Sequence, residues 1–490
     1  MIDRRTVMGS AVGLALATTA GRAAEQTPQR VRFNVASASG LAMLEIYAVG
    51  VAKMKSLPAT DPRSWLFSWY THMGPVAKTQ LLQQVFGADH GAQYQLASAV
   101  WGTCQPHSNA ANEPYFVFWH RLYVLYLERM IASLTAMPAF TLPYWDYTTP
   151  GHSALPMQFR SQGDKKWGSL YQGNRNVAGN GFANVNQGDP IDKFDPGALG
   201  LEALGQSDFL TFNQLLDQGL HGNVHGLVGN GRNMGFVPTA AEDPVFWLHH
   251  ANIDRIWYAW TSNGGVNPTD FTEKFTFTDS AGKPAAVQLN TVAANATLDY
   301  RYDTLPVVAG SNPASAGVSA ERVGPERVLL SSAPAGGGLS ASAPVLLGTT
   351  PRSFSLTPSG GNQGLADILR APSAPKRLRL VLRGVSAAAP PGTLFTVYLN
   401  LPAGVRPRSA AAMPYRVGTL NFFDAVAMPG MEGMAGMSGR DHLFDLTETA
   451  GRLGSMNRLA GPTVITIVAA GPPLPKSMPT VRGSVEVTGR

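Results

Sequence analysis

Two histidines stand at a spacing that suits metal binding. In "HGNVH", His221 and His225 are four residues apart, so on a helix both imidazoles lie on one face and can hold one ion. The stretch lacks the glutamate of the H-E-x-x-H pattern, which argues against a zinc protease. This pair alone is a weak indication of a metal site.

A pair of adjacent histidines follows in "DPVFWLHHANIDR". Neighbouring residues of a helix point about 100° apart, so one ion is not expected to take both rings. His250 has Asp254 one turn later, and metal-bound imidazoles commonly give their second N–H to a carboxylate. We therefore predict that His250 is a ligand supported by Asp254, and that His249 packs or hydrogen-bonds behind it.

Three further histidines lie upstream among aromatic and apolar residues. His72 ends "SWLFSWYTH", His107 ends "CQPH", and His120 stands in "YFVFWHRLYVLYLER" at the start of the strongest apolar helix pattern. Each of them, considered alone, is better explained as a buried structural histidine than as a ligand.

Two longer stretches together resemble the copper signatures of the tyrosinase, polyphenol oxidase and hemocyanin family. They are "FVFWHR" with Glu128 further along the helix, and "DPVFWLHH" with Asp254. The resemblance covers about residues 30–305, where "YRY" at 300–302 is similar to the tyrosine motif that closes the family's core. It implies two copper ions, each held by three histidines. The implied ligands are His72, His107 and His120 for one copper and His221, His225 and His250 for the other.

The sequence departs from the family pattern at one ligand. The middle ligand of the first copper usually lies about nine residues before the third, where this chain has Ala111. His107 then requires a loop that is longer by about four residues, and His90 is the alternative. Cys104 lies near the place where some members form a cysteine–histidine thioether, but a free buried cysteine is the preferred interpretation.

Six neutral imidazoles without a carboxylate ligand suit copper. The resemblance implies that two coppers use O2 to oxidise o-diphenols to o-quinones, in some members after hydroxylating a monophenol. The alternative is oxygen binding without turnover, as in hemocyanin, and a zinc hydrolase is a weaker third reading. The expected partners are O2 and a small phenolic or catecholic substrate, with no nucleic acid.

Several residues around the ligands are predicted to form a second shell or to line the substrate. They are His249, Asp254, Gly222, Asn223, Met234, Phe236 and Val237. Family members that hydroxylate monophenols well often have asparagine directly after the first ligand of the second copper, and this chain has Gly222 there. Asn223 is one residue further on. We therefore predict that catechols are oxidised more efficiently than monophenols are hydroxylated.

The elements that must position these residues fall into two classes. Helical patterns cover 41–56, 121–134, 207–224 and 248–260, and alternating patterns of strands begin after Pro351. This predicts a mainly α catalytic core followed by an antiparallel β-sandwich C-terminal domain. By resemblance, the core is expected to be a four-helix bundle with long loops. The predicted divisions are a signal at 1–24, the core at 25–305, a loose connection at 306–350 and the β-rich domain at 351–490.

Charge is divided between these parts. The chain has a net charge of +6, with −4 over residues 25–305 and +8 over 306–490. No run of Lys and Arg suits nucleic acid, so the opposite charges favour docking of one part on the other. We predict a latent enzyme in which an apolar or aromatic side chain from a β-hairpin occupies the mouth of the site.

The N-terminus reads as a targeting segment. Arg4 and Arg5 precede a mild apolar run and then small residues, which is typical of a twin-arginine signal. Export to the periplasm or beyond the cell is therefore expected. The single cysteine excludes an internal disulfide framework.

A methionine-rich stretch, "MPGMEGMAGM", remains. Thioethers are soft ligands that favour Cu(I), and glycine and proline prevent a regular helix or strand here. The stretch is predicted either to load copper, with a nearby imidazole, or to be a structural loop. The residues concerned are Met428, Met431, Met434, Met437 and His442.

Overall fold

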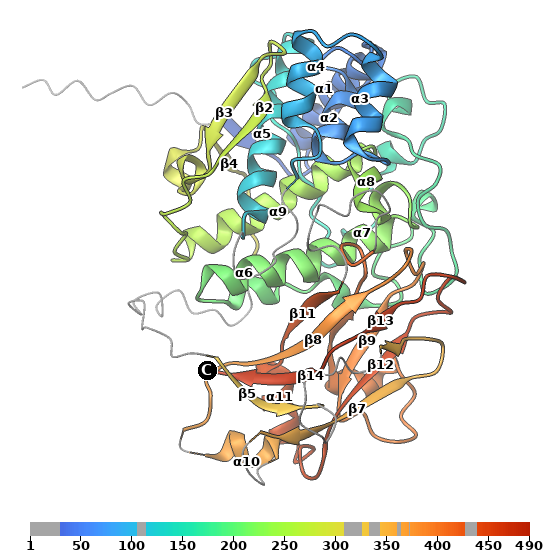
Figure 1. The fold of residues 1–490 in the computed structure, drawn as a ribbon, viewed down its shortest axis with the longest axis vertical. Coiled ribbons are helices and arrows are strands. Elements are labelled where there is room, and N and C mark those ends of the chain that lie inside the picture. The colour runs from blue at the N-terminus through green and yellow to red at the C-terminus, as the bar shows by residue number, and fades with distance from the viewer. Residues whose placement is uncertain are drawn as a thin grey trace, which may run out of the picture.

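A helical part and a β-rich part lie against each other (Figure 1). The structure is a computed structural model, and it describes residues 30–104, 114–307, 326–332, 344–359, 364–371, 373–426 and 439–490. No helix among these residues is long and apolar enough to cross a membrane.

The helical part holds the following α-helices: α1 (Ala38–Ser56), α2 (Trp65–His72), α3 (Lys78–Phe86), α4 (Ala92–Val100), α5 (Phe116–Thr135), α6 (Phe209–Leu215), α7 (Gly222–Val228), α8 (Val237–Ala240) and α9 (Val245–Ser262). Its largely buried helices α5 and α9 pack against each other in the apolar core. Two short sheets accompany them. Strands β1 (Arg30–Arg32) and β4 (Tyr300–Tyr302) are parallel, and β2 (Lys274–Thr278) and β3 (Pro284–Gln288) are antiparallel.

The helix predicted over 207–224 is interrupted. Between α6 and α7 the chain forms a π-helical segment, Leu216–His221, and the first histidine of "HGNVH" is its last residue. Asp208 caps α6 through a hydrogen bond from the Thr211 amide at 2.9 Å. π-Helical turns are rare and often occur at functional sites.

The β-rich part is one antiparallel sheet of ten strands rather than two separate sheets. The strands are β5 (Arg327–Ser331), β6 (Val345–Leu346), β7 (Arg352–Pro358), β8 (Leu378–Ser386), β9 (Phe395–Leu399), β10 (Arg416–Leu420), β11 (Arg440–Asp445), β12 (Thr463–Ala469), β13 (Thr480–Val481) and β14 (Val485–Gly489). Their order is β10-β9-β12-β7-β5-β14-β8-β13-β6, and β11 pairs with β8. Two short helices, α10 (Leu365–Arg370) and α11 (Thr447–Ser455), accompany the sheet.

The boundary predicted at 351 is wrong. Strand β5 pairs with both β14 and β7, and β6 pairs with β13, although both lie within the segment predicted to be a loose connection. The Ala, Ser, Gly and Pro around these strands hid them, because strands of two to five residues give too little alternation to detect.

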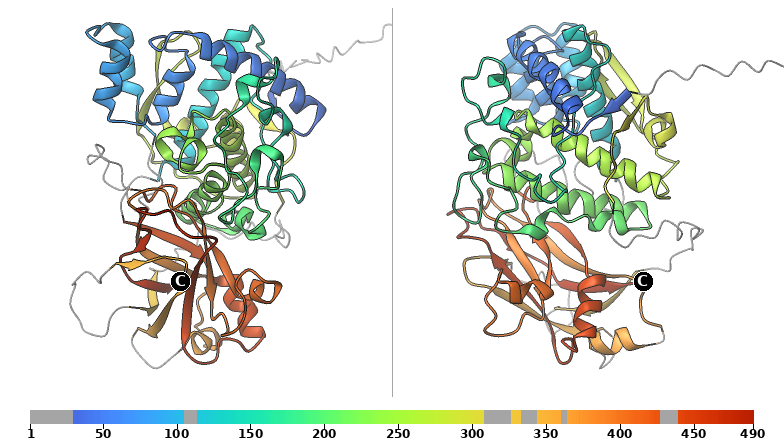
Figure 2. Two further views of the ribbon diagram at one scale, coloured as in Figure 1. Left: turned by 90° about the vertical axis from the view of Figure 1, so that its right-hand side faces the viewer. Right: turned by 180° about the vertical axis from the view of Figure 1, so that it is seen from behind.

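The two parts share an apolar interface. Leu394 and Leu443 of the β-rich part belong to the same buried cluster as the helical core, and Phe236 of the helical part packs against the core of the sheet. Two further views place α6 and α7, in green, against the β-rich part (Figure 2).

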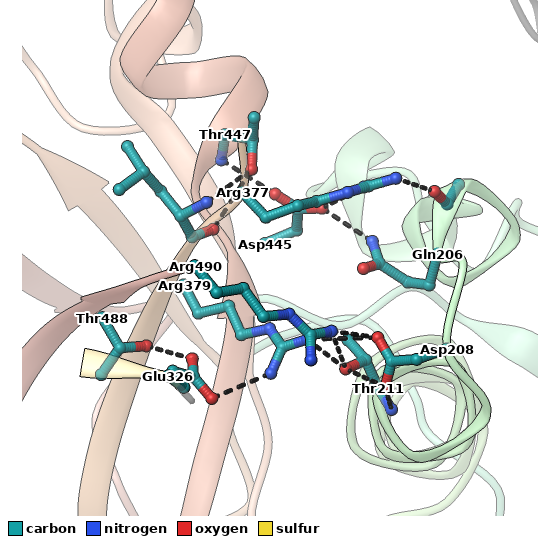
Figure 3. A network of polar contacts seen from close by, with 12 residues as sticks. Gln206, Asp208, Thr211, Glu326, Arg377, Arg379, Asp445, Thr447, Thr488 and Arg490 are labelled. Carbon is teal, nitrogen blue, oxygen red and sulfur yellow. Dashed lines mark hydrogen bonds and ion pairs between the residues drawn. The ribbon is translucent and has the colours of Figure 1, made fainter. Parts of the chain in front are cut away.

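Charged residues flank this apolar contact (Figure 3). Asp208, at the start of α6, forms ion pairs with Arg379 of β8 and with Arg490 beyond β14. Gln206 donates to Asp445 of β11 at 2.7 Å. The opposite net charges of the two parts therefore meet in specific pairs, as the charge pattern predicted.

Candidate metal centre

The structure gathers four imidazoles where "HGNVH" meets α9. His221, His225, His249 and His250 are buried, and one ligand atom of each lies within 4.8 Å of the others. The Nε2 atoms of His221 and His225 are 3.0 Å apart. These four residues form what we call the second cluster.

Backbone carbonyls fix the first two imidazoles. His221 Nδ1 lies 3.1 Å from the carbonyl of Asp217 and 3.1 Å from its carboxylate, and His225 Nδ1 lies 2.7 Å from the carbonyl of Met234. A carbonyl can only accept, so each Nδ1 carries the proton and each Nε2 offers a lone pair to the cluster. Outer bonds of this kind orient metal-bound imidazoles.

A first cluster stands beside it. His72 at the end of α2, His120 on α5 and Cys104 are buried, with one ligand atom of each within 4.8 Å of the others. His120 Nδ1 donates to the Phe116 carbonyl at 2.8 Å, which leaves its Nε2 facing Cys104 Sγ at 3.6 Å. Burial raises the pKa of the Cys104 thiol.

The third ligand predicted for the first cluster, His107, lies outside the described residues. The alternative, His90, does not join the cluster. It is exposed, and its ring stacks on Tyr94 with centroids 4.3 Å apart. The Cys104 side chain is buried and forms no disulfide bond.

The two clusters adjoin. The rings of His120 and His250 are stacked with centroids 4.4 Å apart, and those of His120 and His221 are 6.2 Å apart. Burial, with neighbouring imidazoles, holds the pKa values of His249 and His250 well below their usual range, so both rings are neutral. Neutral imidazole is the form that binds a metal.

Orphaned nitrogens show that the donor set fits a metal. Three buried ring nitrogens of the second cluster have no hydrogen-bond partner among the described residues. They are both nitrogens of His250 and the Nε2 of His249. Buried polar atoms without a partner are costly, and ions bound by both clusters would satisfy them. A set of neutral nitrogen donors suits copper, so the residues fit the predicted group.

The prediction that the Asp254 carboxylate supports His250 is wrong. Asp254 accepts from Arg121 at 2.5 Å and from Arg32 at 3.0 Å, and not from His250. It also accepts from the hydroxyls of Tyr300 and Tyr302 at 2.6 and 2.5 Å. This carboxylate therefore ties β1, β4 and α5 to α9, and two cations compete for it more strongly than a neutral imidazole does.

His249 does hydrogen-bond behind its neighbour, as predicted. Its Nδ1 lies 2.8 Å from the hydroxyl of Tyr147, a fully buried residue in the loop that follows α5. Its other nitrogen faces the second cluster, which the spacing argument did not predict.

Three residues predicted to line the substrate have other surroundings. Met234 and Val237 are fully buried in the core of the helical part, and Phe236 packs on the core of the sheet. Met234 acts on the site through its carbonyl, which accepts from His225.

Residues of the β-rich part cover the second cluster. Phe423, after β10, lies parallel to the imidazole of His225 with centroids 3.9 Å apart. Asn421 donates to the Gln218 carbonyl at 2.7 Å and to Asn223 Oδ1 at 2.9 Å. A Cβ at Gly222 would lie 2.6 Å from Asn421 Oδ1. The sequence predicted an apolar or aromatic side chain from a β-hairpin at the mouth of the site, but "NFFD" carries no signal that selects it from other loops.

The methionine stretch of the predicted copper-loading loop lies outside the described residues. Its imidazole, His442, is buried on β11, where burial lowers its pKa to about 4 against the opposing effect of Asp424 and Asp217. Its Nε2 has no hydrogen-bond partner in the described part of the chain.

Part of this chain is similar in sequence to tyrosinases. Residues 64–206 and 199–263 match the sequence profile described as "Common central domain of tyrosinase". A tyrosinase of Hahella sp. (strain CCB-MM4) is 31% identical over 317 residues, which are 56% of this chain and 64% of that protein. Aureusidin synthase of Antirrhinum majus is 24% identical over 291 residues, 52% of this chain and 49% of that protein. The chain thus spans less than two thirds of the length of these curated relatives.

Solved structures show a similar fold over both parts. A latent aurone synthase (polyphenol oxidase) has a TM-score of 0.60 at 19% identity, with 94% of this chain and 89% of that chain covered. A latent apple tyrosinase has a TM-score of 0.56 at 18% identity, with 94% and 98% covered. At these identities the likeness bears on the fold alone.

Proposed function

We propose that this chain, whose residues 64–263 match the central domain of tyrosinase, is a member of the tyrosinase family and a type-3 dicopper oxidase that uses O2 to convert o-diphenols to o-quinones. The proposed ligands are His72, His107 and His120 for the first copper and His221, His225 and His250 for the second. The observation that carries this proposal is the meeting of two buried groups of side chains that could each hold a metal ion, His72 with Cys104 and His120 in one and His221, His225, His249 and His250 in the other. The helices that carry them are proposed to be the four-helix core of the family.

The protein's own residues prepare this chemistry. The carbonyls of Asp217 and Met234 hold two imidazoles in the ligating tautomer, and Phe116 and Phe246 pack on the rings and keep water out. Two coppers held by these imidazoles would supply the electron transfer between catechols and O2. Two catechols supply the four electrons and four protons that reduce one O2 to two waters.

The same site favours catechols over monophenols in this proposal. Hydroxylation requires a group that takes the phenol proton, and Gly222 has no side chain to hold a water for that purpose. The side-chain amide oxygen of Asn223 already accepts a hydrogen bond from Asn421. Monophenol hydroxylation is therefore proposed to be the weaker activity.

The β-rich part is proposed to keep the enzyme latent. Phe423 covers His225, and Asn421 fills the space above Gly222, so a phenol ring has no access while these side chains are docked. Proteolysis that releases the whole sheet must cut before β5, which begins at Arg327. Mild detergent, which weakens the apolar interface, is the second proposed activator.

Copper content and oxygen uptake test the proposal. The full chain and a chain cleaved before Arg327 are loaded with copper, and O2 consumption and quinone absorbance are followed with a catechol. Two coppers per chain with turnover after cleavage are expected. Reversible O2 binding without quinone supports the hemocyanin-like alternative, and zinc in place of copper contradicts both.

Export through a twin-arginine route stays a prediction, because residues 1–24 lie outside the described part of the chain. Copper loading by Met428, Met431, Met434 and Met437 stays a prediction for the same reason.

A further inference from the structure

We propose that Gln218 is a positioning residue of the second cluster, through which the docked β-rich part holds His221 in its ligating orientation. This inference rests on the proposed dicopper function, because the orientation matters for a bound copper. Gln218 is buried in the π-helical segment Leu216–His221, and this segment lies against β11 (Figure 1).

The side chain of Gln218 pairs with the backbone of β11 as a neighbouring strand would. Its amide nitrogen donates to the Asp441 carbonyl at 2.7 Å, and its amide oxygen accepts from the Leu443 amide at 3.0 Å. These backbone groups lie two residues apart, so they point to the same edge of the strand. In the described part of the chain β11 pairs with β8 alone, on its other edge. Because buried backbone groups need partners, one glutamine replaces the missing strand.

The backbone of Gln218 is also held by the β-rich part. Asn421, which follows β10, donates to the Gln218 carbonyl at 2.7 Å. Three hydrogen bonds to two segments of the β-rich part therefore meet at one residue. Gln218 cannot turn without breaking several of them together.

This restrained residue adjoins the group that orients His221. The Asp217 carbonyl belongs to the planar peptide unit that joins Asp217 to Gln218. It lies 3.1 Å from His221 Nδ1, and it accepts the π-helical hydrogen bond from the Gly222 amide. Since a planar peptide turns as one body, the bonds of Gln218 restrict the direction of this carbonyl. Outer hydrogen bonds of this kind set the orientation of a metal-bound imidazole.

Docking therefore has two effects on the second cluster. Phe423 covers it, and Gln218 restrains the segment that ends at His221. The docked chain retains the second copper more firmly than a chain in which the bonds of Gln218 are broken.

Hydrogen exchange of the metal-free full chain tests the restraint without copper. Gln218→Leu removes both side-chain hydrogen bonds, so the amides of residues 216–222 are expected to exchange about 10-fold faster. Gln206→Leu is the matched control, because Gln206 is also buried and donates to Asp445 of β11 but lies outside the π-helical segment. It should leave exchange at 216–222 unchanged. Equal exchange in Gln218→Leu and wild type would overturn the proposal.

Copper retention tests the effect on the ligand. A chain with His72→Ala and His120→Ala keeps only the second cluster, so it is loaded with one equivalent of Cu(II) and challenged with a chelator. Adding Gln218→Leu is expected to speed copper loss by about 10-fold and to change the nitrogen couplings in electron paramagnetic resonance. Adding Gln206→Leu should alter neither. Both additions retain Phe423, so the access of the chelator is matched.

The outcomes separate the two proposals. If the wild-type full chain binds no copper, both proposals are wrong. Faster exchange in Gln218→Leu with unchanged copper loss would overturn the positioning role alone. Equal effects in Gln206→Leu and Gln218→Leu would also overturn it, because docking in general would then be the cause. Where circular dichroism shows that Gln218→Leu does not fold, Gln218→Met removes the same bonds without a branched side chain and repeats both tests.

Discussion

Phe423 lies parallel to the imidazole of His225, with ring centroids 3.9 Å apart and 6° between the ring planes. One ring comes from the loop after β10 and the other from α7, almost two hundred residues earlier in the chain. A phenol that approaches the second cluster must take the place of this ring. The contact therefore joins the docking of the β-rich part to access to the metal centre.

Replacing Phe423 by Ala should activate the uncut chain. Burying a phenylalanine side chain is worth about 1.5–3 kcal/mol, so we expect kcat/KM for a catechol to rise by about 10-fold or more. This kcat/KM is measured by steady-state oxygen uptake. Phe354→Ala, a half-buried phenylalanine of β7 on the sheet's own core, is the control and should leave the uncut chain latent. Unchanged kcat/KM in Phe423→Ala would show that another group blocks the site.

Replacing Gly222 by Asn should affect docking as well as substrate choice. A Cβ at this position would lie 2.6 Å from Asn421 Oδ1, so the new side chain must displace Asn421. We expect the uncut Gly222→Asn chain to gain catechol oxidation, and the cleaved chain to gain monophenol hydroxylation relative to wild type.

A second substitution distinguishes these two effects. Adding Asn421→Gly should make room for the new side chain and restore latency in the uncut chain, while the substrate ratio of the cleaved chain stays altered. If Gly222→Asn alone leaves the uncut chain fully latent, the close contact with Asn421 does not limit docking.

The charge of Asp208 should contribute to docking. Its carboxylate faces Arg379 and Arg490, and it also caps α6 through Thr211. Asp208→Asn keeps a good cap but removes the charge. For partly exposed pairs we expect about 1 kcal/mol of weaker docking, seen as activation at lower detergent concentration and a smaller effect of added salt. Asp367→Asn, at an exposed pair on α10, is the control.

Acid should destabilise the chain through His442. Burial lowers its pKa to about 4 in the folded protein, whereas an unfolded histidine has a pKa of about 6.5. The unfolded state thus binds more protons between these values, so the stability conferred by neutral His442 is complete above about pH 6.5 and falls as pH decreases towards 4. The expected loss is up to about 3 kcal/mol.

The nearby charges belong to this prediction. Asp424 and Asp217 face His442 and favour its charged form, and Arg440 pairs with Asp424 at 3.1 Å. The free energy of unfolding of the copper-free chain, measured from pH 7 to pH 4, should change less in His442→Gln than in wild type. His152→Gln, at an exposed histidine, should retain the wild-type slope. Identical slopes in all three chains would exclude His442 as the source.

The sequence by itself determined which histidines are candidate metal ligands. Helical spacing put His221 and His225 on one face, and the stretches around His120 and His250 resemble the copper signatures of the tyrosinase family. These features are local, because residues within one or two turns decide them. Periodicity also separated the helical part from the β-rich part, since periods of 3.6 and 2 differ over a few residues.

Tertiary structure alone decided which side chains contact Asp254, His249 and His225. Asp254 is one turn from His250, yet it binds Arg32 and Tyr300 from distant segments, and Tyr147 reaches His249 from a loop about one hundred residues away. Phe423 is placed on His225 by a sheet whose strand order departs from the chain order. Spacing along a chain predicts contacts within an element, whereas contacts between elements depend on how whole surfaces pack, which no single stretch of sequence encodes.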